Sequence, residues 1–250
     1  MKAFSVVGYS KSGKTTTIEC IIRELKSRGY KVGSVKEIHS EGFALDNDPA
    51  SNSNRHRMAG AELVTARGLA ETDVMFPEKL DMQRVFSFYG GYDYVVCEGV
   101  RDYPMPTIMT SATLEGLEPK WSDFAFCVSG PIADQIKGHK GVPAISAISA
   151  ADALADLIEE KVFDLLPNAD PSRCGACGGD CREMAMRILK GEAARSDCTT
   201  SRGTELLIGG ERIKLAPFVQ NVLRGAMLGI VKELHGYREG AEIELKFSIR

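Results

Sequence analysis

The sequence predicts an α/β fold in which a doubly wound, mostly parallel sheet is followed by a second, smaller α+β domain. Three observations predict it. An apolar strand runs into a glycine-rich loop and a helix, strand and helix patterns then alternate along most of the chain, and four cysteines gather in the C-terminal third. Such alternation is typical of parallel sheets covered by helices on both faces. We therefore expect one domain over residues 1–166 and another over residues 167–250.

The N-terminal elements form a strand-helix-strand unit. Residues 3–7 are apolar and predict a strand, and residues 14–28 carry isoleucines and a leucine at helical spacing. Gly29 is expected to end this helix, and residues 31–36 predict the next strand. A unit of this kind makes a right-handed parallel crossover, so the sheet begins here.

The next stretch is polar and then regains periodic structure. Residues 37–54 predict a long exposed loop, which at this length is usually functional. After it we expect a short helix over residues 55–60, a strand over residues 62–66 and a helix over residues 77–88. Residues 93–99 then predict a buried strand that ends on a carboxylate.

Later apolar runs complete the first domain. Residues 108–109, 124–128 and 144–148 predict further strands of the same sheet, followed by a helix over residues 150–165.

The C-terminal part predicts a smaller set of elements. Residues 167–173 are a linker, and strands that flank Gly209-Gly210 form a hairpin. A helix over residues 217–234 and a strand over residues 241–249 close the chain.

Composition narrows the class of protein. The 250 residues carry a net charge of -3 and are 44% hydrophobic, without an apolar run of the roughly 18 residues that a membrane span needs. The acidic balance argues against a nucleic-acid partner. Since the first strand starts at once, no room is left for an export signal, and we expect a cytoplasmic protein.

The strongest motif is Gly8-Tyr-Ser-Lys-Ser-Gly-Lys-Thr15, a full Walker A match between a strand and a helix. Its glycines let backbone N–H groups close around phosphates, and the helix N-terminus adds positive charge. Lys14 would reach the outer phosphates and Thr15 would hold Mg²⁺. The alternative is a glycine-rich turn that matches by chance. The predicted nucleotide-binding residues of this loop are Gly8, Ser10, Lys11, Ser12, Gly13, Lys14, Thr15 and Thr16.

A strand-end acid should complete the magnesium site, because Mg²⁺ usually takes one or two carboxylates from a protein. Glu98 follows a buried strand and would reach the same sheet edge as the loop. The alternative is an ordinary surface acid. Gly99 would allow the backbone to approach the ligand closely.

The loop after the second strand is rich in ionisable groups. Asp46 or Asp48 could orient water or a second face of Mg²⁺, which makes Asp46 a candidate catalytic residue beside Lys14. Arg55 and Arg57 could pair with an anionic partner. A plain solvated loop is the alternative.

Four cysteines are candidate metal ligands: Cys174, Cys177, Cys181 and Cys198. Both Zn²⁺ and a [4Fe-4S] cluster accept four thiolates. The spacing of two, three and then sixteen residues is closer to that of a cluster than to paired zinc knuckles. Four unligated thiols are the remaining alternative.

The N-terminal domain resembles the molybdopterin-guanine dinucleotide biosynthesis protein B (MobB) family. The resemblance rests on the Walker loop, on Lys36-Glu-Ile-His39 followed by Asp46, on residues 55–61 and on Val96-Cys-Glu-Gly99, and it covers about the first 165 residues. It implies a P-loop GTPase-like fold, often dimeric. It also implies an accessory protein that binds GTP, hydrolyses it weakly at most, and assists the guanylyltransferase that joins GMP to molybdopterin.

The chain departs from the family pattern at two places in the loop. Glu37 stands where a histidine is common, and Ala50-Ser-Asn-Ser53 replaces a Gly-Lys-Asp-Ser/Thr stretch. No Asn-Lys-x-Asp sequence is present to read guanine, so GTP over ATP follows from the resemblance alone.

The segment from Cys174 to Cys198 resembles the four-cysteine iron-sulfur domains of electron-transfer and corrinoid proteins, with three residues instead of four between the second and third cysteines. It also resembles an extension fused to some archaeal and anaerobe MobB proteins. Two other functions remain open from the residues. They are a P-loop small-molecule kinase or ligase, and an iron-sulfur electron-transfer module gated by nucleotide.

Overall fold

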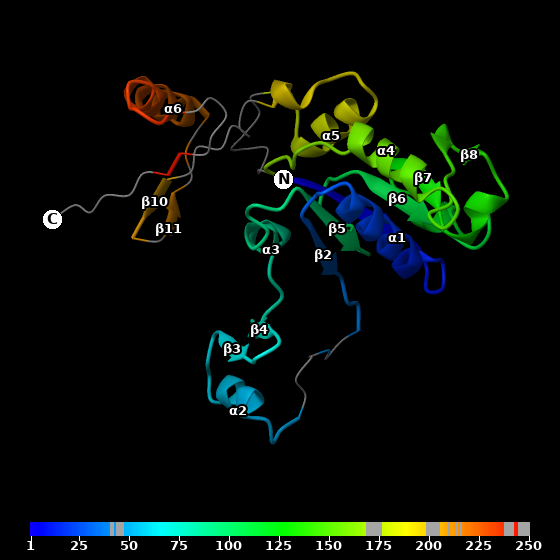
Figure 1. Ribbon diagram of the computed structural model, residues 1–250, viewed down its shortest axis with the longest axis horizontal. Helices are drawn as coiled ribbons and strands as arrows, with labels where there is room; N and C mark the ends of the chain where they lie inside the picture. The colour runs from blue at the N-terminus through cyan, green and yellow to red at the C-terminus, as the bar shows by residue number, and fades with distance from the viewer. Residues whose placement is uncertain are drawn as a thin grey trace.

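The computed structural model describes residues 1–40, 43, 48–168, 177–198, 206–209, 211–213, 215, 217–237 and 243–244. Its centre is a sheet of five parallel strands in the order β2-β5-β1-β6-β7 (Figure 1). These strands are β1 (Lys2–Val7), β2 (Val32–Lys36), β5 (Tyr94–Glu98), β6 (Thr107–Thr110) and β7 (Ala125–Ser129). The parallel α/β core that the alternating pattern predicts is confirmed.

Strand β1 lies in the middle of the sheet. Val6 pairs with Glu98 of β5 on one side and with Ile108 of β6 on the other. The carboxyl ends of these strands therefore share one edge of the sheet. In open parallel sheets ligands bind at this edge, where the strand order reverses.

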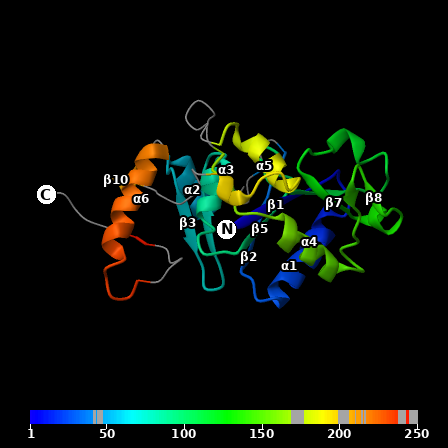
Figure 2. The same cartoon turned by 90° about the horizontal axis from the view of Figure 1, so that it is seen from above.

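Helices cover both faces of the sheet. Helices α1 (Lys14–Ser27) and α4 (Ala151–Lys161) lie side by side on one face, where Ile21 and Ile158 pack with Phe4 (Figure 2). Helix α3 (Met82–Ser87) covers part of the other face. The short helices η1 (Glu118–Lys120) and η2 (Pro131–Asp134), together with the residues next to them, cover the rest of that face. The doubly wound arrangement is confirmed.

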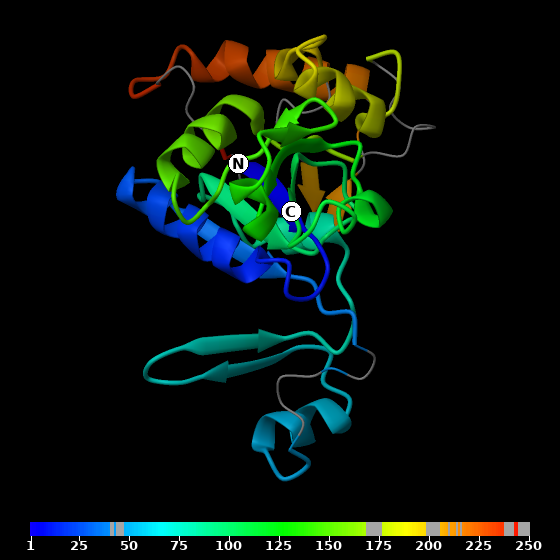
Figure 3. The ribbon, with the colours of Figure 1, turned by 90° about the vertical axis from the view of Figure 1, so that its right-hand side faces the viewer.

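A small unit of α2 (Asn52–Met58), β3 (Val64–Arg67) and β4 (Thr72–Met75) extends away from the main sheet (Figure 3). The helix and strand expected near residues 55–66 exist with shifted bounds, and β3 pairs antiparallel with β4, which the sequence analysis missed. The predicted helix over residues 77–88 begins only at Met82, because the Asp81 side chain accepts a hydrogen bond from Arg84 N and caps it there.

The prediction of a strand over residues 144–148 is wrong. Within this segment, Ala144 forms an isolated parallel bridge with Val128 of β7. The chain just before it forms the short hairpin of β8 (Gly138–His139) and β9 (Val142–Pro143). Ala150 N donates to Ser146 O, so the chain is already turning toward α4 within the predicted strand. The apolar run packs against β7 without extending the sheet.

The C-terminal elements are α5 (Cys181–Leu189), η3 (Arg195–Asp197), β10 (Leu206–Ile208), β11 (Glu211–Ile213) and α6 (Pro217–Val231). The predicted hairpin and the helix after it are confirmed, although the helix ends earlier than expected. The predicted strand over residues 241–249 lies outside the described residues except for positions 243 and 244. Among the described helices, none has the length and apolar character to cross a membrane.

Candidate functional site

The glycine-rich loop joins the carboxyl end of β1 to the first turn of α1. Lys11 and Gly13 have φ angles of 61° and 90°, so the chain takes the left-handed region twice within the loop. Gly13 is the N-cap of α1 and offers no side chain to the free backbone N–H groups. A helix start with open N–H groups is a site for a phosphate.

Lys14 folds back over its own loop. Its Nζ donates to Gly8 O at 3.0 Å and to Tyr9 O at 2.7 Å. Burial lowers the pKa of Lys14, the nearby Glu98 raises it, and Lys120 and Lys36 lower it again. The ammonium therefore lies among other cations, in a position that an anion would stabilise.

Glu98 and Thr15 meet above the end of β5. Thr15 Oγ1 donates to Glu98 Oε1 over a long 3.4 Å, and Lys36 Nζ lies 3.5 Å from the same oxygen. The Glu98 side chain is only 15% exposed. A hydroxyl and a carboxylate at this spacing form a donor set that Mg²⁺ accepts, so the residues present fit a Mg-nucleotide.

Two residues outside the motif, Thr110 and Gly130, contact the loop on the side of β6 and β7. Ser12 is buried and its Oγ lies 2.8 Å from Thr110 Oγ1, whose hydroxyl also reaches Val7 O at 3.2 Å. Gly130 lies against Ser12 from the end of β7. The Ser12 side chain thus faces β6, and its backbone N–H donates to Tyr9 O at 3.2 Å within the loop. Thr110 lies inside an apolar strand pattern, so no sequence signal marked it.

The other predicted loop residues, Ser10, Lys11 and Thr16, are exposed around this site. Gly8 approaches β6 closely, since a Cβ there would lie 2.3 Å from Thr110 O.

Part of the loop after β2 reaches the same edge. Glu37 pairs with Lys79 at 2.6 Å, and His39 Nε2 would be 3.6 Å from a Cβ on Gly99. Asp48 instead accepts from Ala50 N at 2.9 Å in the turn before α2. Asp46, the candidate catalytic acid, lies outside the described residues.

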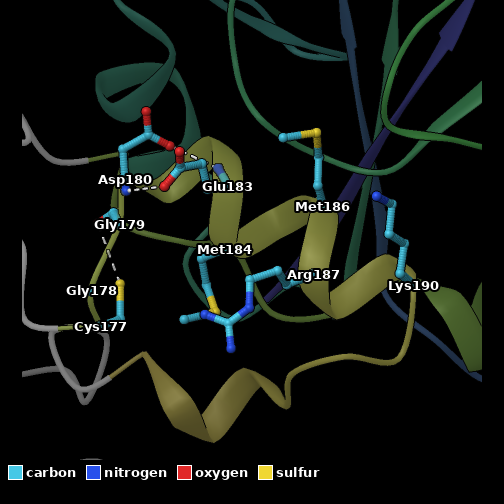
Figure 4. A pocket seen from close by; sticks show the side chains of 9 residues that line it. All are labelled: Cys177, Gly178, Gly179, Asp180, Glu183, Met184, Met186, Arg187 and Lys190. Atoms are coloured by element: carbon cyan, nitrogen blue, oxygen red, sulfur yellow. Dashed lines mark hydrogen bonds between the residues drawn. The ribbon is translucent and has the colours of Figure 1, made fainter.

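The cysteine segment forms a second candidate site. Cys181 and Cys198 are buried in one cluster with Met184 and Ala185, and Cys177 packs against it. Asp180 and Glu183 form a reciprocal capping box that fixes the start of α5 next to Cys181 (Figure 4). Three predicted ligands thus share one apolar cluster, Cys177 and Cys181 from neighbouring positions and Cys198 from further along the chain. Thiols are ligands that an iron-sulfur cluster or Zn²⁺ accepts.

The metal centre is not complete in this part of the structure. Cys174 lies outside the described residues. Among the residues that are described, no three His, Cys, Asp or Glu side chains are arranged so that they could hold a metal ion. A cavity of about 360 Å³ lies beside the segment, lined by Cys177, Gly178, Gly179, Asp180, Glu183, Met184, Met186, Arg187 and Lys190 (Figure 4).

The two sites lie at opposite ends of the sheet. Phe124, just before the amino end of β7, packs with Phe163 and Leu166 against Cys181 and Cys198. Gly130, just after the carboxyl end of β7, lies against the phosphate loop, which is the glycine-rich segment Gly8–Thr15. The five residues of β7 span roughly 17 Å at the usual rise per residue.

Comparison with protein families gives two matches. Residues 3–120 match the family described as "Molybdopterin guanine dinucleotide synthesis protein B", and residues 166–200 match the family described as "Putative Fe-S cluster". The first match contains the phosphate loop and Glu98, and the second contains all four clustered cysteines.

Two curated proteins and a solved structure are similar. The chain is 25% identical over 255 residues to a "Putative molybdopterin-guanine dinucleotide biosynthesis adapter protein" of Methanocaldococcus jannaschii, and the alignment covers 100% of this chain and 98% of that protein. It is 24% identical over 144 residues to a "Probable molybdopterin-guanine dinucleotide biosynthesis adapter protein" of Bacillus subtilis, which covers 57% of this chain and 83% of that protein.

The crystal structure of Bacillus subtilis MobB superposes with a TM-score of 0.54 at 23% identity, over 65% of this chain and 99% of that one. At this identity the likeness shows a shared fold. The glycine-rich loop thus lies in residues 3–120, which match the molybdopterin guanine dinucleotide synthesis protein B family, and the clustered cysteines lie in a segment that matches an iron-sulfur family.

Proposed function

We propose that this protein is a GTP-binding adapter of molybdopterin guanine dinucleotide biosynthesis and hydrolyses GTP slowly at most. The observation that carries the proposal is the convergence of Lys14, Thr15 and Glu98 at one edge of the sheet, inside the part of the chain that matches the MobB family. The curated relatives, both named adapters of this pathway, support the biological role.

The proposed nucleotide site follows from the chemistry of its groups. Lys14 would exchange the carbonyls of Gly8 and Tyr9 for phosphate oxygens, and the backbone N–H groups of the loop would bind the same phosphates. Thr15 and Glu98 would hold Mg²⁺, which neutralises phosphate charge. Asp46 is the residue proposed to orient a water molecule in any slow hydrolysis.

The proposed partners are the molybdopterin guanylyltransferase, molybdopterin itself and a second copy of this chain, in the cytoplasm. An adapter needs a partner enzyme, and the names of both relatives support this part of the proposal. Neither a small-molecule kinase or ligase nor a nucleotide-gated electron-transfer module is favoured by the family matches.

The nucleotide site is tested by calorimetry with Mg²⁺ and either GTP or ATP. Wild-type protein is expected to bind GTP, and Lys14→Ala is expected to abolish the binding. Lys161→Ala is the matched control, because Lys161 pairs with Glu160 at the end of α4, away from the loop. Unchanged GTP binding in Lys14→Ala would remove the site assignment, and equal affinity for ATP would remove the preference for guanine.

We further propose that Cys174, Cys177, Cys181 and Cys198 hold a [4Fe-4S] cluster, with Zn²⁺ as the alternative. The buried Cys181 and Cys198 and the iron-sulfur family match support it. Protein purified without oxygen should be brown and contain about four irons per chain. A colourless protein with one bound zinc would contradict the cluster.

A further inference from the structure

We propose that Lys120 is a further phosphate-binding residue, which binds the terminal phosphate of a nucleoside triphosphate held by the Gly8–Thr15 loop. This inference rests on the proposed nucleotide site and adds a residue that no motif in the sequence marks. It is carried by the position of Lys120, by the rigidity of the turn that bears it and by the charge around it.

The Lys120 side chain lies over the phosphate loop. Its Nζ is 4.2 Å from the centroid of the Tyr9 ring, and Tyr9 is the second residue of the loop. Tyr9 is 44% exposed. Within the described ranges no carboxylate pairs with Lys120, so its charge is held by an aromatic face alone.

The turn that carries Lys120 is fixed from two sides. Arg101 Nη2 donates to Lys120 O at 2.8 Å, which ties the turn to the segment after β5. Glu118 accepts from Lys140 at 2.6 Å and pairs with His139 at 2.9 Å, which ties it to the β8–β9 hairpin. The backbone is therefore held in place, and the long side chain is free to change its contact.

The charges immediately around Lys14 do not balance without an anion. Lys120 and Lys36 both lie close enough to Lys14 to lower its pKa, and Glu98 is the acid that opposes them. Around Lys14, two further lysines are thus opposed by one carboxylate. A polyphosphate with its Mg²⁺ carries the net negative charge that this arrangement lacks.

A bound triphosphate would draw Lys120 away from Tyr9. A cation over an exposed aromatic ring is weakly held, whereas a charge-assisted hydrogen bond to phosphate is among the strong ones. Lys14 would reach the β- and γ-phosphates, so it contributes to the binding of both GDP and GTP. Lys120 would then distinguish a triphosphate from a diphosphate, because only the triphosphate supplies the additional charge.

The test compares GTP with GDP, each with Mg²⁺, in wild-type protein and in Lys120→Met. The variant should lose about tenfold in affinity for GTP, the effect of one hydrogen bond to a charged group, while GDP affinity changes less than about twofold. Lys120→Arg, which keeps a cation, should retain most of the GTP affinity.

Lys2→Met is the matched control. Lys2 also lies over an aromatic ring, at 5.5 Å from the centroid of Tyr94, but it stands at the amino end of β1, opposite the glycine-rich loop. It should bind both nucleotides as wild type does. Trp121, the only tryptophan of the chain, adjoins Lys120, so its emission should change on adding GTP more than on adding GDP.

The outcomes separate this inference from the proposed function. Equal losses for GTP and GDP in Lys120→Met, or no loss for either, would overturn the role of Lys120 and leave the nucleotide site standing. Absence of binding by wild-type protein would overturn both. Thermal unfolding checks that the variant is folded, and Lys120→Gln repeats the comparison if Lys120→Met is unstable.

Discussion

Gly130 lies where the end of β7 touches the phosphate loop. Its φ of 77° and ψ of -170° belong to a conformation that glycine alone adopts readily. A Cβ at this position would lie 2.3 Å from Ser12 O and 3.1 Å from Ser111 O, both backbone atoms. At the scale of one residue, the shape of the nucleotide site depends on the absence of a side chain two strands away.

Gly130→Ala should therefore displace the phosphate loop. We expect a loss of about 3 kcal/mol in the free energy of unfolding, from backbone strain and from the contact with Ser12. Affinity for Mg-GTP should fall by about tenfold or more, because the loop N–H groups move. Urea unfolding and calorimetry measure the two effects.

Gly141→Ala is the control for this change. Gly141 has a similar φ of 82°, but open space surrounds its Cα. It should cost about 1 kcal/mol of strain and leave GTP affinity unchanged. Equal effects of the two substitutions would show that the contact with Ser12 is unimportant.

If Lys14 binds phosphate as proposed, nucleotide binding should depend on pH. Burial lowers its pKa below the ordinary 10.5. The charged form of Lys14 binds phosphate, so the affinity for nucleotide should be highest at pH values below the pKa of Lys14 in the nucleotide-free protein. The affinity should fall as the pH rises through that pKa, which lies below 10.5. Calorimetry with Mg-GTP from pH 7 to pH 10 measures this decline, and Lys14→Arg should weaken binding but flatten the profile. The same decline in both proteins would contradict the assignment to Lys14.

At the scale of elements, Arg28 joins the end of α1 to α4. Its guanidinium donates to Glu24 on its own helix and to Asp156 and Glu159 on α4, at 2.6 to 2.9 Å. The hydrogen bonds to Asp156, Glu159 and Glu24 raise the pKa of Arg28. Because one planar guanidinium binds three carboxylates, it fixes how α1 and α4 lie relative to each other on the sheet. The phosphate loop is at the opposite end of α1.

Arg28→Met should lower the free energy of unfolding by about 1 to 2 kcal/mol, since it removes several charge-assisted hydrogen bonds of a networked pair of helices. Arg28→Lys should give an intermediate loss, because it keeps the charge without the fork. Denaturant unfolding measures both.

Arg23→Met is the comparison, since Arg23 makes one exposed ion pair with Glu19 on the same helix. It should cost less than about 0.5 kcal/mol. A loss as large as that of Arg28→Met would mean that helix propensity, not the connection to α4, is being measured.

At the scale of the molecule, the cysteine segment packs on the amino end of the sheet and the proposed nucleotide site lies on the carboxyl end. Arg195 donates through Nη2 to Leu165 O at 2.6 Å, and Tyr103 OH donates to Leu166 O at 2.6 Å. Phe124 packs on the same cluster as Cys181. Residues that precede the cysteine segment therefore supply part of the wall around the thiols.

Phe124→Ala should reduce the iron bound per chain and lower the unfolding free energy by about 3 kcal/mol, because it opens a cavity next to Cys181 and Cys198. GTP affinity should stay within about twofold of wild type, since the nucleotide site is at the other end of β7. Iron analysis of protein purified without oxygen, thermal unfolding and calorimetry test the three parts.

Phe88→Ala is the matched substitution, because Phe88 is 53% exposed. It should leave the iron content unchanged. Full iron loading and wild-type stability in Phe124→Ala would show that the cysteine segment does not depend on the first domain.

Local patterns account for the parts of the fold that were predicted correctly. The strand, loop and helix from Lys2 to Ser27 follow from an apolar run, glycines and helical spacing, all within one stretch of chain. The same reasoning failed at residues 144–148, because an apolar run that packs on β7 has the same composition as one that pairs with it. Strand β4 was missed for the converse reason, since Thr72–Met75 is largely exposed and lacks a buried apolar face.

Short patterns of residue types are enough to identify the Walker loop, the strand-end carboxylate of Glu98, the four clustered cysteines and the resemblance to the MobB family. Only the tertiary structure placed Lys120 over Tyr9, Thr110 and Gly130 beneath the loop, and Phe124 beside Cys181 and Cys198. These contacts join residues far apart in the chain. Their geometry depends on strand order and packing, which no local pattern encodes.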